Sequence, residues 1–254
     1  MNLRKDFRDR ADLETYLREL FPVAAGGLSP LFVGGRGPAE KRLDAFQAAK
    51  YAGSRNFLTG SVSRLSPYIR HGVITLREVL DYVREKFSGR NLDKFIQELA
   101  WRDYWQRIYF QVGDGVWRDR EPSKTAVKCG DQFPEDLGET GLGCMDAFAS
   151  ELETNGYLHN HARMWMAAYW IHWRRISWKL GARWFLAHLV DGDPASNNLS
   201  WQWVGSTFSS KPYIFNRENL ERYTEGRYCA VCSRNADCPF DKSYDELSQE
   251  LFGQ

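Results

Sequence analysis

The chain has 254 residues, enough for one large domain or two small ones. Its 43% hydrophobic and 26% charged residues are an ordinary globular balance, which argues against an intrinsically disordered chain. The 34 basic and 33 acidic residues give a net charge of +1, which by itself says little about nucleic acid. No run approaches the roughly 18 apolar residues of a membrane span, and the charged start lacks the apolar core of a secretory signal. We therefore expect a soluble, cytoplasmic protein with no membrane partner.

Most segments space their apolar residues as helices do, and strand signals are weak, which predicts an all-α fold. Thr75 and Glu78 add a capping-box pattern at one predicted helix start. The absence of βαβ units argues against a Rossmann domain. In chain order, the expected helices cover residues 12–20, 38–52, 75–87, 93–112, 145–154, 159–180, 182–190, 200–204 and 244–252. The expected loops cover residues 25–38, 53–66, 113–143 and 191–198.

Residues 156–190 contain no acidic side chain but several basic ones, and four of the five histidines. Such a stretch can contact phosphates, or it can be a solvated helix face. The ten tryptophans are also clustered, which is typical of a large aromatic core, a stacking surface or electron transfer. Composition alone does not choose between these alternatives.

The five cysteines include a CAVC pair, Cys229 and Cys232, with Cys238 six residues later. Because disulfides are rare in cytosolic proteins, this pattern indicates metal or redox chemistry.

Five segments carry a more specific signal. They are SRLSPYIRHG (63–72), ELAWRDYW (98–105), TGLGCMDA (140–147), GYLHNHARM (156–164) and LVDGDPASNNLSWQW (189–203). In order and spacing they resemble the FAD-binding domain of the photolyase/cryptochrome family. The resemblance implies one all-α, helical FAD-binding domain over residues 1–254. Residues 1–37 would be an N-terminal extension in place of an antenna domain, with no antenna chromophore, and residues 217–254 a cysteine-containing C-terminal segment.

The predicted cofactor site also makes physical sense. Ser63 and Ser66 precede a helix and offer hydroxyl and backbone N–H groups to a pyrophosphate, although they also fit a simple N-capping motif. Asp191 and Asp193 flank a glycine, and no further metal-ligand set accompanies them. The FAD-binding residues implied by the resemblance are Tyr51, Ser63, Leu65, Ser66, Phe95, Arg102, Asn160, Arg163, Asp191, Asp193 and Asn197.

Glu98 and Trp101 lie three residues apart and share a helix face. The resemblance implies that they contact a pyrimidine dimer extruded from DNA, and that reduced FAD splits the dimer by light-driven electron transfer. The implied DNA-contacting residues are Arg55, Glu98, Trp101, His161, Met164 and Trp203. The implied catalytic residues are Glu98, Asn160, Asn197, Trp201 and Trp178. We expect a monomer that prefers single-stranded, UV-damaged DNA; a cryptochrome-like photoreceptor and a (6-4) lesion enzyme are the alternatives.

By resemblance, Trp201 and Trp178 are the first two members of a tryptophan chain that photoreduces the flavin. The third should lie in residues 125–135, which contain no tryptophan. Trp173, Tyr169 or Trp184 could replace it, or all three could be core residues. Trp173 also stands where many relatives place an aspartate, so Arg163 is expected to lack its usual counter-ion.

The C-terminal segment resembles the ending of iron–sulfur bacterial photolyases. This implies a [4Fe–4S] cluster on Cys144, Cys229, Cys232 and Cys238, with Cys129 left over. Zinc on the same four thiolates, unligated thiols, and binding by only three of the cysteines remain the alternatives.

Overall fold

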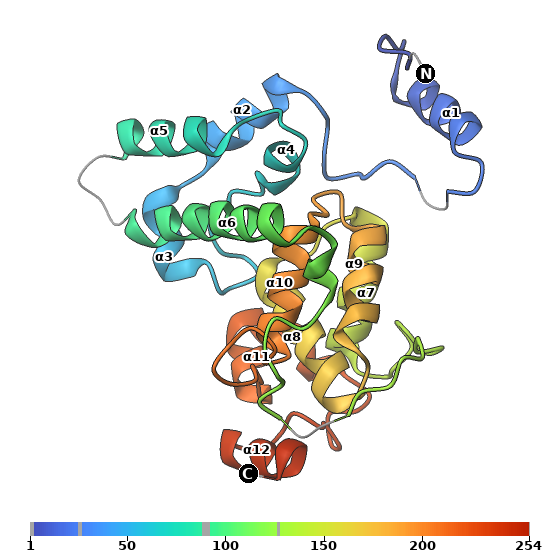
Figure 1. The fold of residues 1–254 in the computed structure, drawn as a ribbon, viewed down its shortest axis with the longest axis vertical. Coiled ribbons are helices and arrows are strands. Elements are labelled where there is room, and N and C mark those ends of the chain that lie inside the picture. Colours follow the sequence, from blue (N-terminus) through green and yellow to red (C-terminus); the bar gives the residue numbers. More distant parts are fainter. Residues whose placement is uncertain (1–2, 25–26, 88–91, 126–127, 254) are drawn as a thin grey trace.

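The structure is a computed structural model that describes residues 3–24, 27–87, 92–125 and 128–253. Residues 25–26 of the expected loop 25–38 and residues 126–127 of the expected loop 113–143 lie outside these ranges. Residues 1–2 and 254, at the ends of the expected domain, also lie outside them. The α-helices are Arg10–Leu20 (α1), Arg36–Ala45 (α2), Ala48–Ser54 (α3), Ser66–Arg70 (α4), Leu76–Lys86 (α5), Asp93–Val112 (α6), Gly143–Asn155 (α7), Asn160–Ala168 (α8), Trp178–His188 (α9), Pro194–Val204 (α10), Arg217–Thr224 (α11) and Tyr244–Phe252 (α12). The described residues form no sheet, so the all-α prediction is confirmed (Figure 1).

Local sequence signals account for several helix boundaries. The Thr75 hydroxyl accepts a hydrogen bond from the Glu78 backbone N–H at 3.1 Å, and the Glu78 carboxylate accepts one from Thr75 N at 2.7 Å. This capping box confirms the predicted start of α5. The same backbone hydrogen bond is the main reason that the pKa of Glu78 is lowered to about 2. Helix α6 runs over the predicted residues 93–112.

The single helix predicted over residues 159–180 is wrong. Helix α8 ends at Ala168, a π-helical turn, Tyr169–Trp173, follows, and α9 begins only at Trp178. Between them, Arg175 takes a positive φ of 56°, and the segment pairs with Gly130 instead of continuing the helix. Gly130 N donates to Arg175 O at 2.7 Å, and Gly130 O accepts from Ser177 N at 2.9 Å. A long-range backbone contact therefore ends the helical pattern.

Two other boundaries also differ from the prediction. The helix expected over 38–52 is divided at Phe46, which has an extended backbone between α2 and α3. The loop expected over 191–198 ends early, because Asp193 caps α10 and Pro194 occupies its first position. Helix α4 begins at Ser66, the last residue of the loop expected over 53–66, and α11 is not among the expected helices.

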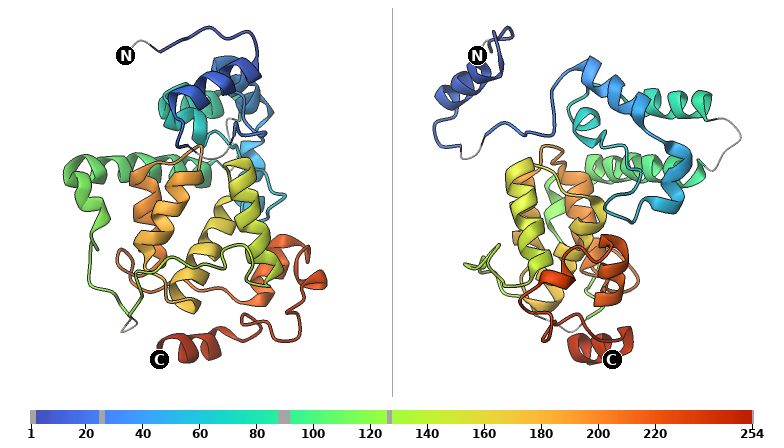
Figure 2. Two further views of the ribbon diagram at one scale, coloured as in Figure 1. Left: turned by 90° about the vertical axis from the view of Figure 1, so that its right-hand side faces the viewer. Right: turned by 180° about the vertical axis from the view of Figure 1, so that it is seen from behind.

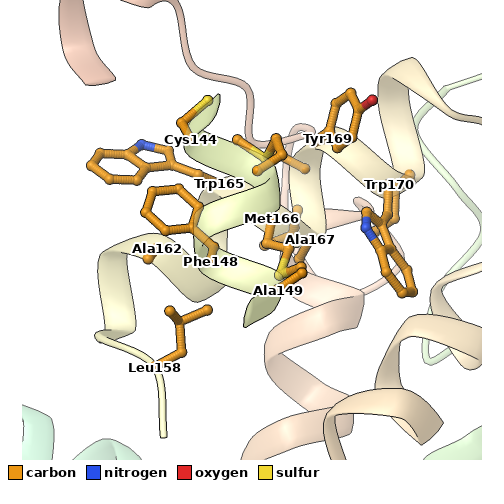
Figure 3. Packing of buried hydrophobic residues seen from close by; sticks show 14 of the residues in the cluster. Cys144, Phe148, Ala149, Leu158, Ala162, Trp165, Met166, Ala167, Tyr169 and Trp170 are labelled. Atoms are coloured by element: carbon orange, nitrogen blue, oxygen red, sulfur yellow. The ribbon is translucent and has the colours of Figure 1, made fainter. Parts of the chain in front are cut away.

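The buried hydrophobic residues form two clusters. The N-terminal cluster consists mainly of residues between Phe32 and Phe95 and includes Tyr157. The C-terminal cluster lies between Leu142 and Phe240, and Figure 3 shows Phe148 and Trp165 within it. The two rings stack at a centroid distance of 5.9 Å. Helix α6 crosses the bundle of α7 to α10 at one end (Figures 1 and 2). The division of residues 1–254 into one domain with two terminal segments stays a prediction.

Candidate functional site

A buried ion pair joins α8 to the loop before α10. Arg163 donates to Asp191 Oδ2 at 3.0 Å and to Leu158 O at 2.7 Å. The Asp191 side chain is 4% exposed, and its Oδ1 atom has no hydrogen-bond partner among the described residues. Trp173 stands where the usual counter-ion of Arg163 is expected, but Arg163 is still paired, because Asp191 supplies a carboxylate from another segment. A buried carboxylate oxygen without a partner is uncommon, and a ligand donor would satisfy it.

Asp193 links the start of α10 to α6. Its carboxylate caps α10 through Ala195 N and accepts from Gln106 Nε2 at 2.7 Å. Arg102 Nη2 lies 3.9 Å from the same carboxylate. Burial lowers the pKa of Arg102, while Asp193 and Asp191 oppose that shift. The predicted cofactor residues Arg102, Asp191 and Asp193 therefore lie in one buried charged cluster.

The predicted phosphate-binding loop lies beside this cluster. Arg70, at the end of α4, donates to Gly192 O at 2.7 Å. Ser63 and Ser66 are half-buried, and Leu65 is buried in the N-terminal cluster. The loop turns sharply at Arg64, which has a positive φ of 50°. The structure thus brings the predicted phosphate site and the predicted flavin-edge residues together.

Asn197 lies one turn further along α10. Its amide nitrogen donates to Ala182 O and to Asn198 Oδ1, both at 3.0 Å. The amide oxygen is therefore the group that Asn197 can offer to a ligand. On α8, Asn160 Nδ2 lies 3.7 Å from Met164 Sδ, so these two predicted residues are also neighbours.

Tyr51 of α3 packs against the first turns of α6, which carry Phe95 and Glu98. The Tyr51 and Phe95 rings meet edge to face at 5.2 Å. The Glu98 carboxylate lies 2.8 Å from Arg55 Nη1 and 2.9 Å from Lys94 Nζ. The predicted lesion-binding glutamate and the predicted DNA-binding arginine therefore bind each other in this structure.

Two tryptophans predicted to hold the lesion are exposed. Trp101 is 42% exposed and stacks on Trp105 with a centroid distance of 5.0 Å. Trp203 is 40% exposed and lies against Tyr213 at 5.7 Å. Exposed indole rings of this kind are stacking surfaces for bases. That the two rings sandwich one lesion stays a prediction.

His161 lies below the surface. It is 9% exposed and packs against Trp165 and Tyr223 with centroid distances of 4.7 and 5.0 Å. Burial lowers the pKa of His161 to about 4, so the ring is neutral at physiological pH. Its predicted contact with a DNA phosphate stays a prediction that this burial opposes.

The predicted electron-relay residues are buried in the C-terminal cluster. Trp201 is 2% exposed and Trp178 is 7% exposed. Trp178 Nε1 donates to Asp119 Oδ1 at 2.8 Å, and its ring is parallel to that of Trp117. Sequence reasoning missed Trp117, because nothing in the local sequence connects it with a residue so far along the chain. Trp173 instead packs against Phe215 and Phe240.

The four predicted metal ligands line one narrow pocket between α7 and the C-terminal segment. The pocket walls are formed by Leu142, Cys144, Arg217, Leu220, Tyr228, Cys229, Cys232, Asn235, Cys238 and Phe240. Burial raises the pKa of Cys144 far above its usual value and that of Cys229 to about 11. Among the described residues, no three His, Cys, Asp or Glu side chains converge closely enough to hold one metal ion.

Residues 95–228, more than half of the chain, match the protein family described as the FAD binding domain of DNA photolyase. The chain belongs to this family. Deoxyribodipyrimidine photo-lyase of Streptomyces griseus is 35% identical over 162 residues, which are 63% of this chain and 35% of that protein. The Alkalihalophilus pseudofirmus enzyme of the same name is 34% identical over 193 residues, 70% of this chain and 40% of the relative. The chain thus spans well under half of these relatives' length.

Solved structures share the fold. A class III photolyase from Agrobacterium tumefaciens superposes with a TM-score of 0.68 at 24% identity, over 96% of this chain and 53% of the other. An archaeal photolyase from Sulfolobus tokodaii, solved with two FAD molecules, gives a TM-score of 0.67 at 26% identity, over 83% and 49%. In the described part of the chain, no helix has both the length and the apolar character needed to cross a membrane.

Proposed function

We propose that this chain binds FAD where α6, α8 and α10 meet and uses light to split cyclobutane pyrimidine dimers in UV-damaged DNA. The observation that carries the proposal is the buried Arg163–Asp191 pair, whose Asp191 Oδ1 atom has no partner among the described residues. Such a cluster suits a polar, planar cofactor with hydrogen-bond donors on its edge. Relatives named deoxyribodipyrimidine photo-lyase support the same reaction.

The chain's own residues have distinct tasks at this site. The loop of Ser63 and Ser66 would hold the pyrophosphate, and Arg163 with Asp191 would hold the flavin edge. Arg102 is fixed beside Asp193 and contributes positive charge, which favours a reduced, negatively charged cofactor. When bound, FAD supplies light-driven one-electron chemistry.

On the substrate side, the exposed Trp101 would stack on the lesion after it leaves the base stack. The Arg55–Glu98 ion pair then separates, because Arg55 meets a phosphate and Glu98 accepts a hydrogen bond from a pyrimidine. Extrusion costs less free energy in single-stranded DNA, so we expect unpaired lesions to be preferred.

The test is an absorption spectrum of the purified protein, followed by blue light on the reduced protein with UV-damaged oligo(dT). Flavin bands and light-dependent loss of dimers are expected, with a matched Trp101→Ala variant that keeps its flavin but repairs poorly. A protein that fails to take up added FAD would contradict the proposal.

A cryptochrome-like photoreceptor is the second candidate. The chain is 28% identical over 218 residues to a cryptochrome DASH of Solanum lycopersicum, 78% of this chain and 38% of the relative. The buried, neutral His161 also removes one expected cationic contact with DNA. In the same experiment, flavin bands without loss of dimers would favour this candidate.

We also propose that the cysteine pocket holds a [4Fe–4S] cluster. The pocket brings Cys144, Cys229, Cys232 and Cys238 together from distant segments. A zinc ion would hold its four sulfurs about 2.3 Å from one point, whereas a four-iron cluster spreads its thiolates over a larger core. Zinc on the same four thiolates is the alternative, and analysis of the metal in the purified protein separates the two.

A further inference from the structure

One face of α9 carries Trp178 and, one turn further on, Gly181, against which Trp201 packs. Gly181 in α9 has no side chain, and the Trp201 ring fills the place of the missing one. A Cβ atom at Gly181 would lie 2.1 Å from Cη2 and 2.4 Å from Cζ3 of Trp201. Trp178 lies three residues before Gly181 and therefore on the same face of α9. Trp201, on α10, thus packs against the helix face that also carries Trp178.

Trp117 continues this row of rings toward the surface. It ends the 3₁₀ turn Gly113–Trp117 that follows α6. Its ring and that of Trp178 are parallel, with an interplanar angle of 8° and a centroid distance of 6.4 Å. Trp178 is buried, whereas Trp117 is half-buried. The pair therefore leads from the interior to a ring that solvent can reach.

The charges around the two rings differ. The Asp119 carboxylate accepts the Trp178 Nε1–H hydrogen bond at 2.8 Å, so it stabilises positive charge on Trp178. The Arg183 guanidinium lies 5.4 Å from the centroid of the Trp117 ring. A cation there disfavours positive charge on Trp117 and promotes loss of its indole proton to water once the ring is oxidised.

We infer that Trp117 is the outer electron donor of a relay formed by Trp117, Trp178 and Trp201, in place of the tryptophan absent from residues 125–135. The inference rests on the proposed FAD site, because photoexcited oxidised flavin is the oxidant. Each tryptophan passes one electron inward. Trp117 passes one electron to Trp178 and releases its Nε1 proton to water, and an added thiol returns one electron and one proton to it.

A second row of tryptophans leads away from Trp201, and its members stay buried. Trp201 lies 6.0 Å from Trp170, and Trp170 lies 5.3 Å from Trp184. Trp170 and Trp184 are only 2% and 7% exposed, so a dissolved thiol reaches them poorly. Trp184, which was one of the replacements expected from the sequence, is therefore the matched control.

The test compares FAD-loaded wild type, Trp117→Phe and Trp184→Phe under blue light with dithiothreitol, following flavin bleaching and the transient absorption of the tryptophan radical. Trp117→Phe should lose most of the photoreduction and the long-lived deprotonated radical, while Trp184→Phe keeps both. In wild type illuminated without thiol, mass spectrometry should find oxidised tryptophan at position 117.

Two other outcomes are informative. Full photoreduction in Trp117→Phe, or oxidation mapped to Trp184 in wild type, would overturn the inference while the FAD site stands. A protein without flavin bands would instead overturn the proposed function, and the relay with it. Mapping of oxidised tryptophan in the wild-type protein needs no variant. The inference can therefore be refuted even if Trp117→Phe folds poorly.

Discussion

At the level of single residues, the candidate site contains buried charges that are stable only when they are paired. Arg163 and Asp191 are 22% and 4% exposed, and each would be costly to bury alone. The pair therefore holds α8 and the loop before α10 together without a ligand. It also leaves one buried carboxylate oxygen, Asp191 Oδ1, without a hydrogen-bond partner among the described residues.

Replacing Asp191 should consequently affect both stability and binding. Asp191→Asn leaves the Arg163 charge buried without compensation, and we expect unfolding free energy to fall by about 2–4 kcal/mol. Urea denaturation measures the loss, and flavin content after purification measures binding. Asp81→Asn, which breaks the exposed Arg77–Asp81 pair, is the control and should leave the urea midpoint almost unchanged. Equal midpoints for the two variants would refute this role of Asp191.

The buried histidines give the protein a pH dependence with a definite sign. Burial lowers the pKa of His161 from 6.5 to about 4, so the unfolded chain binds a proton more readily than the folded one between these values. The contribution of the neutral His161 ring to stability is therefore fully present above pH 6.5, and it is lost as the pH drops toward 4. His161→Gln should remove part of this slope in urea titrations across that range, because His159 and His172 have lowered pKa values as well. A slope unchanged in His161→Gln would show that the pKa of His161 is the same in the folded and unfolded chains.

At the scale of elements, sequence periodicity predicts those helices whose ends are set locally. The bounds of α6 and the capping box of α5 follow from residues within one turn of each end. The break between α8 and α9 does not, because it depends on Gly130, which lies far back in the chain. Among the site residues, the same limit hid the Trp117–Trp178 stack and the true partner of Arg163. Contacts of this kind exist only after the elements have packed.

The cysteine pocket is a second feature at this scale, since it ties the start of α7 to the C-terminal segment. Gly143 N donates to Cys232 Sγ at 3.3 Å, so the backbone of α7 already touches one thiol. Cys129 lies elsewhere, with its Sγ atom 3.7 Å from Ile171 O.

If the pocket holds a cluster, Cys144→Ser should strip the iron while Cys129→Ser retains it. The measurements are iron content per chain and the broad iron–sulfur absorption of protein purified without oxygen. A bound metal also keeps the thiolates deprotonated despite burial, so removal by a chelator should lower the thermal midpoint of wild type. Equal iron in the two serine variants would rule out this ligand set.

At the scale of the whole molecule, the two hydrophobic clusters are joined by neighbouring residues that face in opposite directions. Tyr157 belongs to the N-terminal cluster, and Leu158 belongs to the C-terminal one. Val190 packs against the former and Leu189 is buried in the latter. Neither cluster can open without moving the segments that carry the candidate FAD site.

We therefore expect the body of the protein to unfold as one cooperative unit, as the prediction of a single domain requires. Far-ultraviolet circular dichroism reports all helices, and tryptophan fluorescence reports mainly the C-terminal cluster, which holds Trp165, Trp170 and Trp201. The two signals should give the same urea midpoint. Separate midpoints would mean that the clusters are independent domains.

The empty position at Gly181 has a consequence for protein engineering. The Trp201 ring occupies the volume that a methyl group at position 181 would need. The ring can approach α9 this closely only because Gly181 carries a hydrogen atom there instead of a side chain. Alanine at this position would act as a wedge, pushing the ring away and slowing electron hopping, whose rate decays steeply with separation. In the inferred relay, one glycine would therefore set an electron-transfer distance. Designers of artificial flavoproteins could use the same device.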